Sequence, residues 1–377
     1  MRVDLPEPSV DERAHSERLS ALIRDEVRAN DGAIGFQRFM ELALYAPGLG
    51  YYSAGAIKFG RDGDFVTAPE LGFVFARCLA RAIAPTLRET QGDILELGPG
   101  SGALAADVLS ELERLDALPN RYRLLERSAD LRERQRATLG KSCPHLLGLA
   151  DWIDAPPASP WRGALIANEV IDALPVRLFA LSDDTVFERC VAIADDDGFE
   201  WRNVMADASF ARAVDATLGS WRTTLPQPYR SELCPMLSPW IAEVTRSMTA
   251  GAAWFIDYGH ERADYYAASR REGTLRCHYR HRVHDDPLIL PGLQDITAWV
   301  DFDALAAAAQ DAGFDVDGMS SQTDFLAANG LSEIFSAAFE AAADETERYR
   351  LAQEVKHLTL PAEMGQAFKI MVLHRRA

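Results

Sequence analysis

The chain has 377 residues and an ordinary globular composition, with 48% hydrophobic and 25% charged residues. Its formal net charge of -18 at pH 7 argues against a nucleic-acid partner, because proteins that bind a phosphate backbone usually carry a basic excess or a basic patch. The length predicts one large domain with insertions, or two intimate domains.

The cysteines and the N-terminus indicate a reducing compartment. The five cysteines are odd in number and form no C-x-x-C pair, so the sequence indicates neither a disulfide framework nor a zinc knuckle. The N-terminus lacks the apolar core of a signal peptide, and no apolar run approaches the length of a membrane span. We therefore expect a cytoplasmic protein with a short disordered lead and no membrane insertion.

The N-terminal segment, residues 1–90, is predicted to be mainly helical from about residue 16. Apolar residues recur at helical spacing in LSALIRDEV and FQRFMELAL. A glycine-rich stretch, residues 48–71, then interrupts the helices. Loops of this length without regular structure are commonly functional lids, so we expect this one to border an active site.

The most informative motif is ILELGPGSG, residues 94–102, in which a short apolar strand ends in an acid and three alternating glycines. Gly98, Gly100 and Gly102 allow the backbone to turn sharply and to approach a ligand where a Cβ atom would collide. Ser101 is expected to cap the helix that follows in ALAADVLSELERL. Strand, turn and helix together predict a nucleotide-sized site.

The glycine spacing favours one of two cofactor classes. A dinucleotide site reads G-x-G-x-x-G, whereas this chain has E-x-G-x-G-x-G, with Glu96 ahead of the glycines and Pro99 within the turn. The pattern resembles motif I of the class I methyltransferases that use S-adenosylmethionine. A carboxylate near the loop suits an ammonium and a sulfonium better than a pyrophosphate. We therefore predict S-adenosylmethionine as the cofactor, held by Glu96 and the three glycines.

A second acid supports this choice. The segment YRLLERSADLRERQ, residues 122–135, reads as an apolar strand that ends at Glu126 and is followed by a charged helix. An acid at the carboxyl end of this strand can accept hydrogen bonds from both ribose hydroxyls. Taken alone, Glu126 would more often be a solvated acid at a helix start. Together with the glycine motif, it is predicted to bind the cofactor.

The fold class is predicted as α/β, with a Rossmann-like sheet and helices on both faces. Residues 91–180 form its cofactor-binding core. Strands are expected near Ile94, Tyr122, Leu147, Ala164 and Ala252. Residues 251–377 are expected to complete the sheet with a substrate-covering loop and a C-terminal antiparallel hairpin, near Phe314 and residues 368–375.

More chain lies between two of these strands than one crossover helix requires, which predicts an accessory insertion over residues 181–250. Residues 178–201 alternate like antiparallel strands, and residues 210–248 read as helices broken by PQPYRSELCP. Such an insertion can cover the carboxyl edge of the sheet, where ligands bind in open α/β folds. We expect a buried and selective acceptor site there.

Carboxylates and a tyrosine follow two predicted strands. ANEVIDALP places Asn168, Glu169 and Asp172 after one strand, and WFIDYGH places Asp257 and Tyr258 at the end of the next. Each acid could by itself cap a helix or close a turn. Their convergence favours a cationic acceptor, above all a guanidinium, whose planar fork matches carboxylates. We predict that Asn168 contacts the cofactor, that Glu169 and Asp172 hold the guanidinium, and that Asp257 or Tyr258 assists.

Two other patterns narrow the chemistry. Asn168 is followed by Glu169 and not by the Pro-Pro-aromatic run with which base and glutamine amino-methyltransferases bind a planar amide or amine. Such acceptors are therefore disfavoured. The segment CHYRHRVHDD holds His278, His281 and His284, but this spacing with intervening arginines is weak evidence for zinc. We expect a basic loop and no metal.

Read in order, these motifs resemble the MidA-like methyltransferases over residues 32–373. The motifs are GRDGDFVTAPEL, ELGPGSG, NEVIDALP, IDYGH, GTLRCHYRHRVHDDPLILPG with DITAWVDF, and MGQAFKIMVL. The family includes the mitochondrial complex I assembly factor. The resemblance implies a class I methyltransferase fold and methylation of an arginine in a protein partner, a subunit of respiratory complex I in the mitochondrial case. The loop with Thr67, Pro69 and Glu70 is then expected to close over the methionine end of the cofactor.

Two alternatives remain open from the sequence. The chain could bind the cofactor and act mainly as an assembly chaperone, or it could methylate a small molecule on nitrogen or oxygen. The sequence leaves open the acceptor, the number of methyl groups added and the oligomeric state.

Overall fold

The computed structural model describes residues 5–53, 68–183 and 185–376. The chain divides into two compact units, and each is assembled from three stretches of sequence. The core unit consists of Val66–Ile171, Ser238–Gly259 and Phe302–Ala377. The accessory unit consists of Met1–Phe65, Asp172–Leu237 and His260–Asp301.

These units differ from the four consecutive segments expected from the sequence. The N-terminal helices and the strands of the predicted insertion belong to one unit, and the loop 260–301 belongs to it as well. Residues 66–90 and 238–250, expected in the N-terminal segment and the insertion, belong to the core unit. A division of the chain into consecutive segments differs from this arrangement because the chain leaves the core unit and later returns to it.

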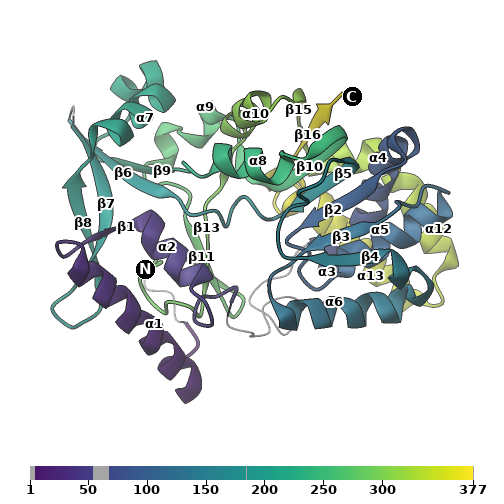
Figure 1. Cartoon of the computed structure of the whole chain (residues 1–377), viewed down its shortest axis with the longest axis horizontal. Coiled ribbons are helices and arrows are strands. Elements are labelled where there is room, and N and C mark those ends of the chain that lie inside the picture. Colours follow the sequence, from purple (N-terminus) through teal and green to yellow (C-terminus); the bar gives the residue numbers. More distant parts are fainter. Residues whose placement is uncertain (1–4, 54–67, 184, 377) are drawn as a thin grey trace. The chain divides into compact units, whose positions relative to one another are not determined.

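The core unit is built on a twisted sheet with the strand order β15-β16-β10-β5-β2-β3-β4 (Figure 1). Its strands are β2 (Asp93–Leu97), β3 (Tyr122–Leu125), β4 (Ala150–Ile153), β5 (Trp161–Asn168), β10 (Met248–His260), β15 (Asp315–Ser321) and β16 (Phe368–Arg375). The strands from β4 to β10 run parallel, and β16 is antiparallel to both of its neighbours. This is the predicted Rossmann-like α/β architecture.

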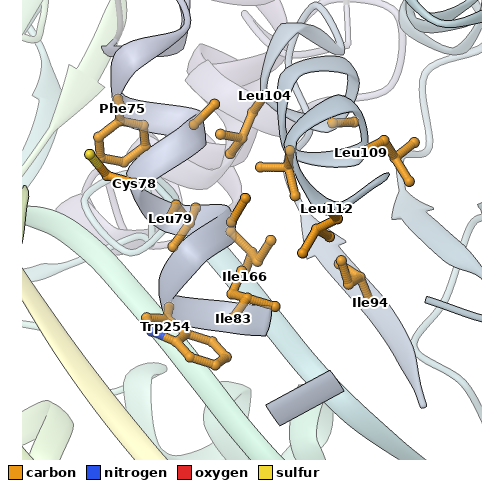
Figure 2. Close-up of a cluster of buried hydrophobic side chains, with 14 of the residues drawn as sticks. Phe75, Cys78, Leu79, Ile83, Ile94, Leu104, Leu109, Leu112, Ile166 and Trp254 are labelled. Atoms are coloured by element: carbon orange, nitrogen blue, oxygen red, sulfur yellow. The ribbon is translucent and has the colours of Figure 1, made fainter. Parts of the chain in front are cut away.

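One face of the sheet packs against α4 (Val74–Thr90) and α5 (Ala103–Arg114). Figure 2 shows how side chains from both helices meet Ile94, Ile166 and Trp254 of the strands. Along α4, buried Phe75, Cys78, Leu79 and Ile83 occupy positions i, i+3, i+4 and i+8, which is the pattern of one helix face. Fully burying one such side chain contributes about 1.5 to 3 kcal/mol.

The opposite face carries α8 (Leu237–Thr245), whose Trp240 ring lies 6.2 Å from the ring of Phe255 on β10. Helices therefore cover both faces, as predicted. The remaining helices of the core unit are α3 (Ala68–Leu71), α6 (Ala129–Ser142), α10 (Phe302–Asp311), α11 (Gln322–Ala328), α12 (Leu331–Ala341), α13 (Glu345–Thr359) and α14 (Met364–Ala367).

Two predicted strands of the sheet differ from expectation. The strand expected near Leu147 begins later, at Ala150, because a 3-10 turn starts at Pro144 and runs to Leu149. The C-terminal strands pair as predicted, but they are not a hairpin, since α11 to α14 separate β15 from β16. These helices pack apolar residues such as Leu326 and Ile334 into the core.

The accessory unit contains an antiparallel sheet with the order β1-β7-β6-β9, and β8 pairs with β7. Its strands are β1 (Ile34–Gly35), β6 (Arg177–Ser182), β7 (Thr185–Ile193), β8 (Phe199–Met205) and β9 (Tyr229–Leu233). The helices are α1 (Val10–Ala29), α2 (Phe36–Tyr45), α7 (Ala208–Leu218) and α9 (Arg262–Tyr265). The predicted N-terminal helices and the alternating strands of the insertion are thus both observed.

A smaller sheet of this unit has the order β12-β11-β13. Its strands are β11 (Arg276–Tyr279), β12 (Arg282–His284) and β13 (Asp295–Thr297). The short strand β14 (Val300–Asp301) is not part of this sheet. The stretch PQPYRSELCP, expected only to break helices, contains β9, because Tyr229 and Ser231 are buried while the strand pairs with β6.

No helix in the described part of the chain combines the length and apolarity that crossing a membrane requires.

Candidate functional site

The candidate site of the core unit lies where parallel strands end. Because β2, β3, β5 and β10 run in the same direction, the residues after them share one edge of the sheet. The glycine loop follows β2, Glu126 follows β3, Glu169 follows β5, and Tyr258 lies near the end of β10. This edge therefore holds most of the predicted site residues.

The glycine loop has the backbone that its sequence predicts. Gly98, Gly100 and Gly102 have φ values of +61°, +52° and +83°, in the left-handed region that favours glycine. A Cβ atom on Gly102 would lie 3.1 Å from the Cα atom of Gln135, so a side chain there would push α6 away. A Cβ atom on Gly100 would meet no atom within 4 Å in the described part of the chain, which leaves space for a ligand.

Ser101 is not the N-cap residue of α5, contrary to expectation. The helix begins at Ala103 with Gly102 as its N-cap residue, because the left-handed Gly102 separates Ser101 from the first turn. The Ser101 hydroxyl accepts a 3.4 Å hydrogen bond from the Ala103 N–H and donates to a carboxylate oxygen of Glu70. Ser101 thus connects the glycine loop to α3.

The hydrogen bond to Glu70 brings part of the predicted lid to the glycine loop. Glu70 and Pro69 lie half-buried in α3, and Glu70 accepts from Ser101 within the loop. Thr67, predicted with them, lies outside the described residues, as does much of the glycine-rich stretch before it. Their contact with the methionine end of a cofactor stays a prediction.

Glu96 is buried beneath the loop, with 2% of its surface exposed. Its Oε2 atom accepts a 2.9 Å hydrogen bond from the Tyr122 hydroxyl on the neighbouring strand β3. Burial raises the pKa of Glu96 to about 7, and the hydrogen bond from Tyr122 opposes that shift. Near neutral pH its carboxyl group is therefore only partly charged, and its predicted role as a cofactor ligand remains a prediction.

Glu126 lies directly after β3, as predicted. Its Oε1 atom accepts a 2.7 Å hydrogen bond from the Ser128 N–H, and its Oε2 atom accepts a 3.3 Å bond from Gln135 Nε2. Burial raises the pKa of Glu126, while these hydrogen bonds stabilise its charge. Since each carboxylate oxygen has about two acceptor sites, both oxygens can still accept a hydroxyl.

Asn168, Glu169 and Tyr258 form one hydrogen-bonded group at the ends of β5 and β10. The Tyr258 hydroxyl donates to Glu169 Oε2 over 2.5 Å, and Asn168 Nδ2 donates to Glu169 Oε1 over 3.2 Å. Glu169 has a φ of +54°, and its N–H donates a 2.9 Å bond to the Ile256 carbonyl. A left-handed backbone is uncommon for a residue other than glycine, and it occurs here at the residue whose carboxylate Tyr258 and Asn168 contact.

Asp257 and Asp172 lie in different surroundings. Asp257 is 1% exposed, and its two oxygens accept hydrogen bonds from the N–H groups of Ile171 and Tyr258, at 3.0 and 2.9 Å. It therefore connects the turn after β5 to the end of β10. Asp172 belongs to the accessory unit, where it is buried and its carbonyl accepts a 2.9 Å bond from Ala298 N–H.

Gln135 and Trp152 were not singled out from the sequence. Gln135 is fully buried and contacts the glycine loop, Glu126 and Trp152. One feature could have identified it, because Leu131, Gln135 and Leu139 recur every four residues and are the buried residues of α6. A single polar residue on the apolar face of a helix indicates a specific partner.

The site has a polar group suited to S-adenosylmethionine. The Oδ1 atom of Asn168 is buried and has no hydrogen-bond partner among the residues that the structure describes. A buried acceptor of this kind is costly unless a donor such as an ammonium or a hydroxyl meets it. With the open side of Gly100 and the remaining acceptor sites of Glu126, this edge fits an adenosyl amino acid.

The described residues show no metal centre and no disulfide. Within them, no group of three or more His, Cys, Asp and Glu side chains is arranged to hold a metal ion. The five cysteines are free thiols.

Comparison with known proteins supports this assignment. Residues 78–320 match the family described as "Putative S-adenosyl-L-methionine-dependent methyltransferase". The crystal structure of a Burkholderia thailandensis protein bound to S-adenosyl-homocysteine is 40% identical to this chain. It matches with a TM-score of 0.93 and covers 99% of this chain and 95% of its own.

Two curated relatives are named Protein arginine methyltransferase NDUFAF7, mitochondrial. The Rattus norvegicus protein is 27% identical over 98% of this chain and 88% of its own length. The Homo sapiens protein is 28% identical over 92% of this chain and 81% of its own length. The chain therefore belongs to the MidA-like family of S-adenosylmethionine-dependent methyltransferases, and S-adenosylmethionine is its cofactor.

Proposed function

We propose that this methyltransferase modifies a guanidinium nitrogen of an arginine in a protein partner. The observation that carries the proposal is the hydrogen bond between Tyr258 and Glu169, which holds a carboxylate at the carboxyl ends of neighbouring strands. The name of the curated relatives, protein arginine methyltransferase, supports the same acceptor class.

The acceptor chemistry favours a carboxylate at this position. A free guanidinium is always protonated and is a poor nucleophile, so the site must orient one nitrogen and take up its proton. When bound, S-adenosylmethionine supplies a methyl group on a positively charged sulfur. In our proposal Glu169 orients the guanidinium and accepts the proton that leaves as the nitrogen–carbon bond forms and the carbon–sulfur bond breaks.

The neighbouring residues support this role for Glu169. Tyr258 and Asn168 each donate to one of its oxygens, which keeps the carboxylate in one orientation. Both oxygens of Asp257 accept backbone N–H groups, and we therefore assign Asp257 a positioning role. We retain Asp172 as a second carboxylate for the guanidinium.

We also propose the partner and the location of the reaction. The MidA-like resemblance favours an arginine-containing subunit of a respiratory complex I, acting as a substrate in the cytoplasm. The net charge of -18 suits a basic protein segment, since opposite charge speeds encounter.

The test is methyl transfer from labelled S-adenosylmethionine to isolated complex I subunits and to a lysate from a deletion strain. We expect label in methylated arginine after acid hydrolysis of a protein, and loss of the label when that arginine is replaced by lysine. Label in a small molecule would overturn the protein-arginine assignment. Cofactor binding without transfer to any lysate component would instead favour the assembly chaperone.

A further inference from the structure

Gln135 on α6 contacts two parts of the candidate cofactor site, the glycine loop and Glu126, and also Trp152 on β4. Its Nε2 atom donates to the Gly100 carbonyl over 2.9 Å and to Glu126 Oε2 over 3.3 Å. Its Oε1 atom accepts a 2.8 Å hydrogen bond from the indole N–H of Trp152 on β4. Gln135 is fully buried, so these protein groups take the place of water around its amide.

The contacts fix the orientation of the Gln135 amide. An indole N–H can only donate, so the amide oxygen must face Trp152 and the NH2 group must face the loop and Glu126. The reversed amide would direct its oxygen at the Gly100 carbonyl and at a carboxylate, while its NH2 group would face the Trp152 donor. All three hydrogen bonds would then be lost.

The position of α6 depends on the glycine loop. A Cβ atom on Gly102 would lie 3.1 Å from Cα and 3.2 Å from Cβ of Gln135, and also 3.2 Å from Leu139 Cδ1. The helix can therefore approach the loop this closely without being displaced because Gly102 has no side chain. This approach brings the short Gln135 amide within reach of both Gly100 and Glu126.

The bond from Gln135 also orients the predicted ribose ligand. Glu126 Oε1 is held by the Ser128 N–H, and Oε2 is held by Gln135, so neither oxygen is free to rotate away. Because burial raises the pKa of Glu126, these donors also help to keep its carboxylate charged. A charged and fixed carboxylate is what two ribose hydroxyls require.

We propose that Gln135 is a positioning residue that couples the glycine loop to Glu126 and thereby determines selectivity for a cofactor with an intact ribose diol. The proposal rests on the assignment of Glu126 to the ribose, and it does not depend on which acceptor is methylated. It is therefore tested by ligand binding alone.

The test is a double-mutant cycle read by calorimetric titration of the full chain. The variants are Gln135→Met, which keeps the length and apolar bulk of the side chain, Glu126→Ala, and the combination. The ligands are S-adenosylhomocysteine and its 2′-deoxy analogue. We expect Gln135→Met to weaken binding of the ribose ligand about tenfold and to reduce its preference over the deoxy ligand. The double variant should lose less affinity for S-adenosylhomocysteine than the product of the two single-variant losses.

Two controls separate positioning from a general loss of structure. Gln310→Met makes the same change at an exposed position of α10 and should leave both affinities unchanged. Trp152→Phe keeps Gln135 but removes the donor to its oxygen, and it should reduce ribose preference to a smaller extent.

Three results would overturn the proposal. In the first, Gln135→Met weakens both ligands equally. In the second, the double variant loses affinity by the product of the losses of Gln135→Met and Glu126→Ala, as two independent residues would. In the third, Glu126→Ala retains full ribose preference, and the ribose assignment then fails together with the coupling. If Gln135→Met does not fold, the same criteria apply to Trp152→Phe.

Discussion

The hydroxyl of Tyr258 donates a 2.5 Å hydrogen bond to Glu169, joining residues at the ends of neighbouring parallel strands. The Tyr258 ring is itself held against Phe368, with ring centroids 4.2 Å apart. Because β16 supplies Phe368, a strand remote in sequence helps to fix the orientation of the Glu169 carboxylate. This arrangement makes Glu169 the first residue to test for acceptor chemistry.

Replacing Glu169 by glutamine should separate methyl transfer from cofactor binding. The amide keeps the size of the side chain but removes the negative charge that pairs with a guanidinium. We expect transfer to an arginine-containing protein to fall by about two to four powers of ten, as is typical when a charge-stabilising or proton-accepting group is lost. Affinity for S-adenosylhomocysteine should stay near wild type, and Tyr258→Phe should show a smaller loss of transfer. Full activity, or a proportional loss of cofactor binding, would contradict the assignment.

Asp172→Asn tests the second proposed carboxylate. Asp172 is 5% exposed in the accessory unit, and the amide retains its shape. We expect a loss of transfer within the same range of about two to four powers of ten, with cofactor affinity unchanged. The measurement is single-turnover methylation beside calorimetric titration. Wild-type transfer by this variant would remove Asp172 from the acceptor site.

Glu126→Ala should weaken cofactor binding and leave the fold intact. Loss of a hydrogen bond to a charged group costs about 1.5 to 3 kcal/mol, which corresponds to roughly ten- to a hundredfold in affinity. Titration with S-adenosylhomocysteine measures the loss, and circular dichroism verifies the fold. Unchanged affinity would show that Glu126 only orders the turn before α6.

Gly100→Val should abolish binding of both adenosyl ligands. Gly100 has a φ of +52°, where a β-branched residue is strained, and its open side would receive the new side chain. The wild-type chain should bind S-adenosylmethionine and S-adenosylhomocysteine but not NAD, because the glycine spacing differs from the dinucleotide pattern. Tight NAD binding without a response to either adenosyl ligand would refute the interpretation of the loop.

Glu96→Gln should change how stability depends on pH. Burial raises the pKa of Glu96 to about 7, above its ordinary value, so its protonated form favours the folded state. That contribution is complete at pH values below the unfolded pKa of about 4.3 and is lost as the pH rises through 7. Between pH 5 and 8 the free energy of unfolding should therefore fall by about 1 to 3 kcal/mol more in wild type than in Glu96→Gln. Urea unfolding of the cofactor-free wild type and of the variant at both pH values measures this difference. An equal fall in the free energy of unfolding in the two proteins would contradict it.

The sequence by itself determined the parts of this protein that depend on local rules. The glycine loop requires positive φ values at Gly98, Gly100 and Gly102, and only glycine adopts them readily, so the pattern predicts the turn directly. Apolar runs that end in polar residues likewise predict parallel strands with a ligand edge, which places Glu126 correctly after β3.

Only the tertiary structure decided how distant residues meet. Tyr122 reaches Glu96 because β2 and β3 are adjacent, and Gln135 reaches Gly100 because α6 packs closely on Gly102. Which residues make up each of the two units was also decided by the tertiary structure, since each unit gathers three separate stretches of chain. Such contacts depend on strand order and helix packing, which arise from burial over the whole fold, and no local spacing encodes them.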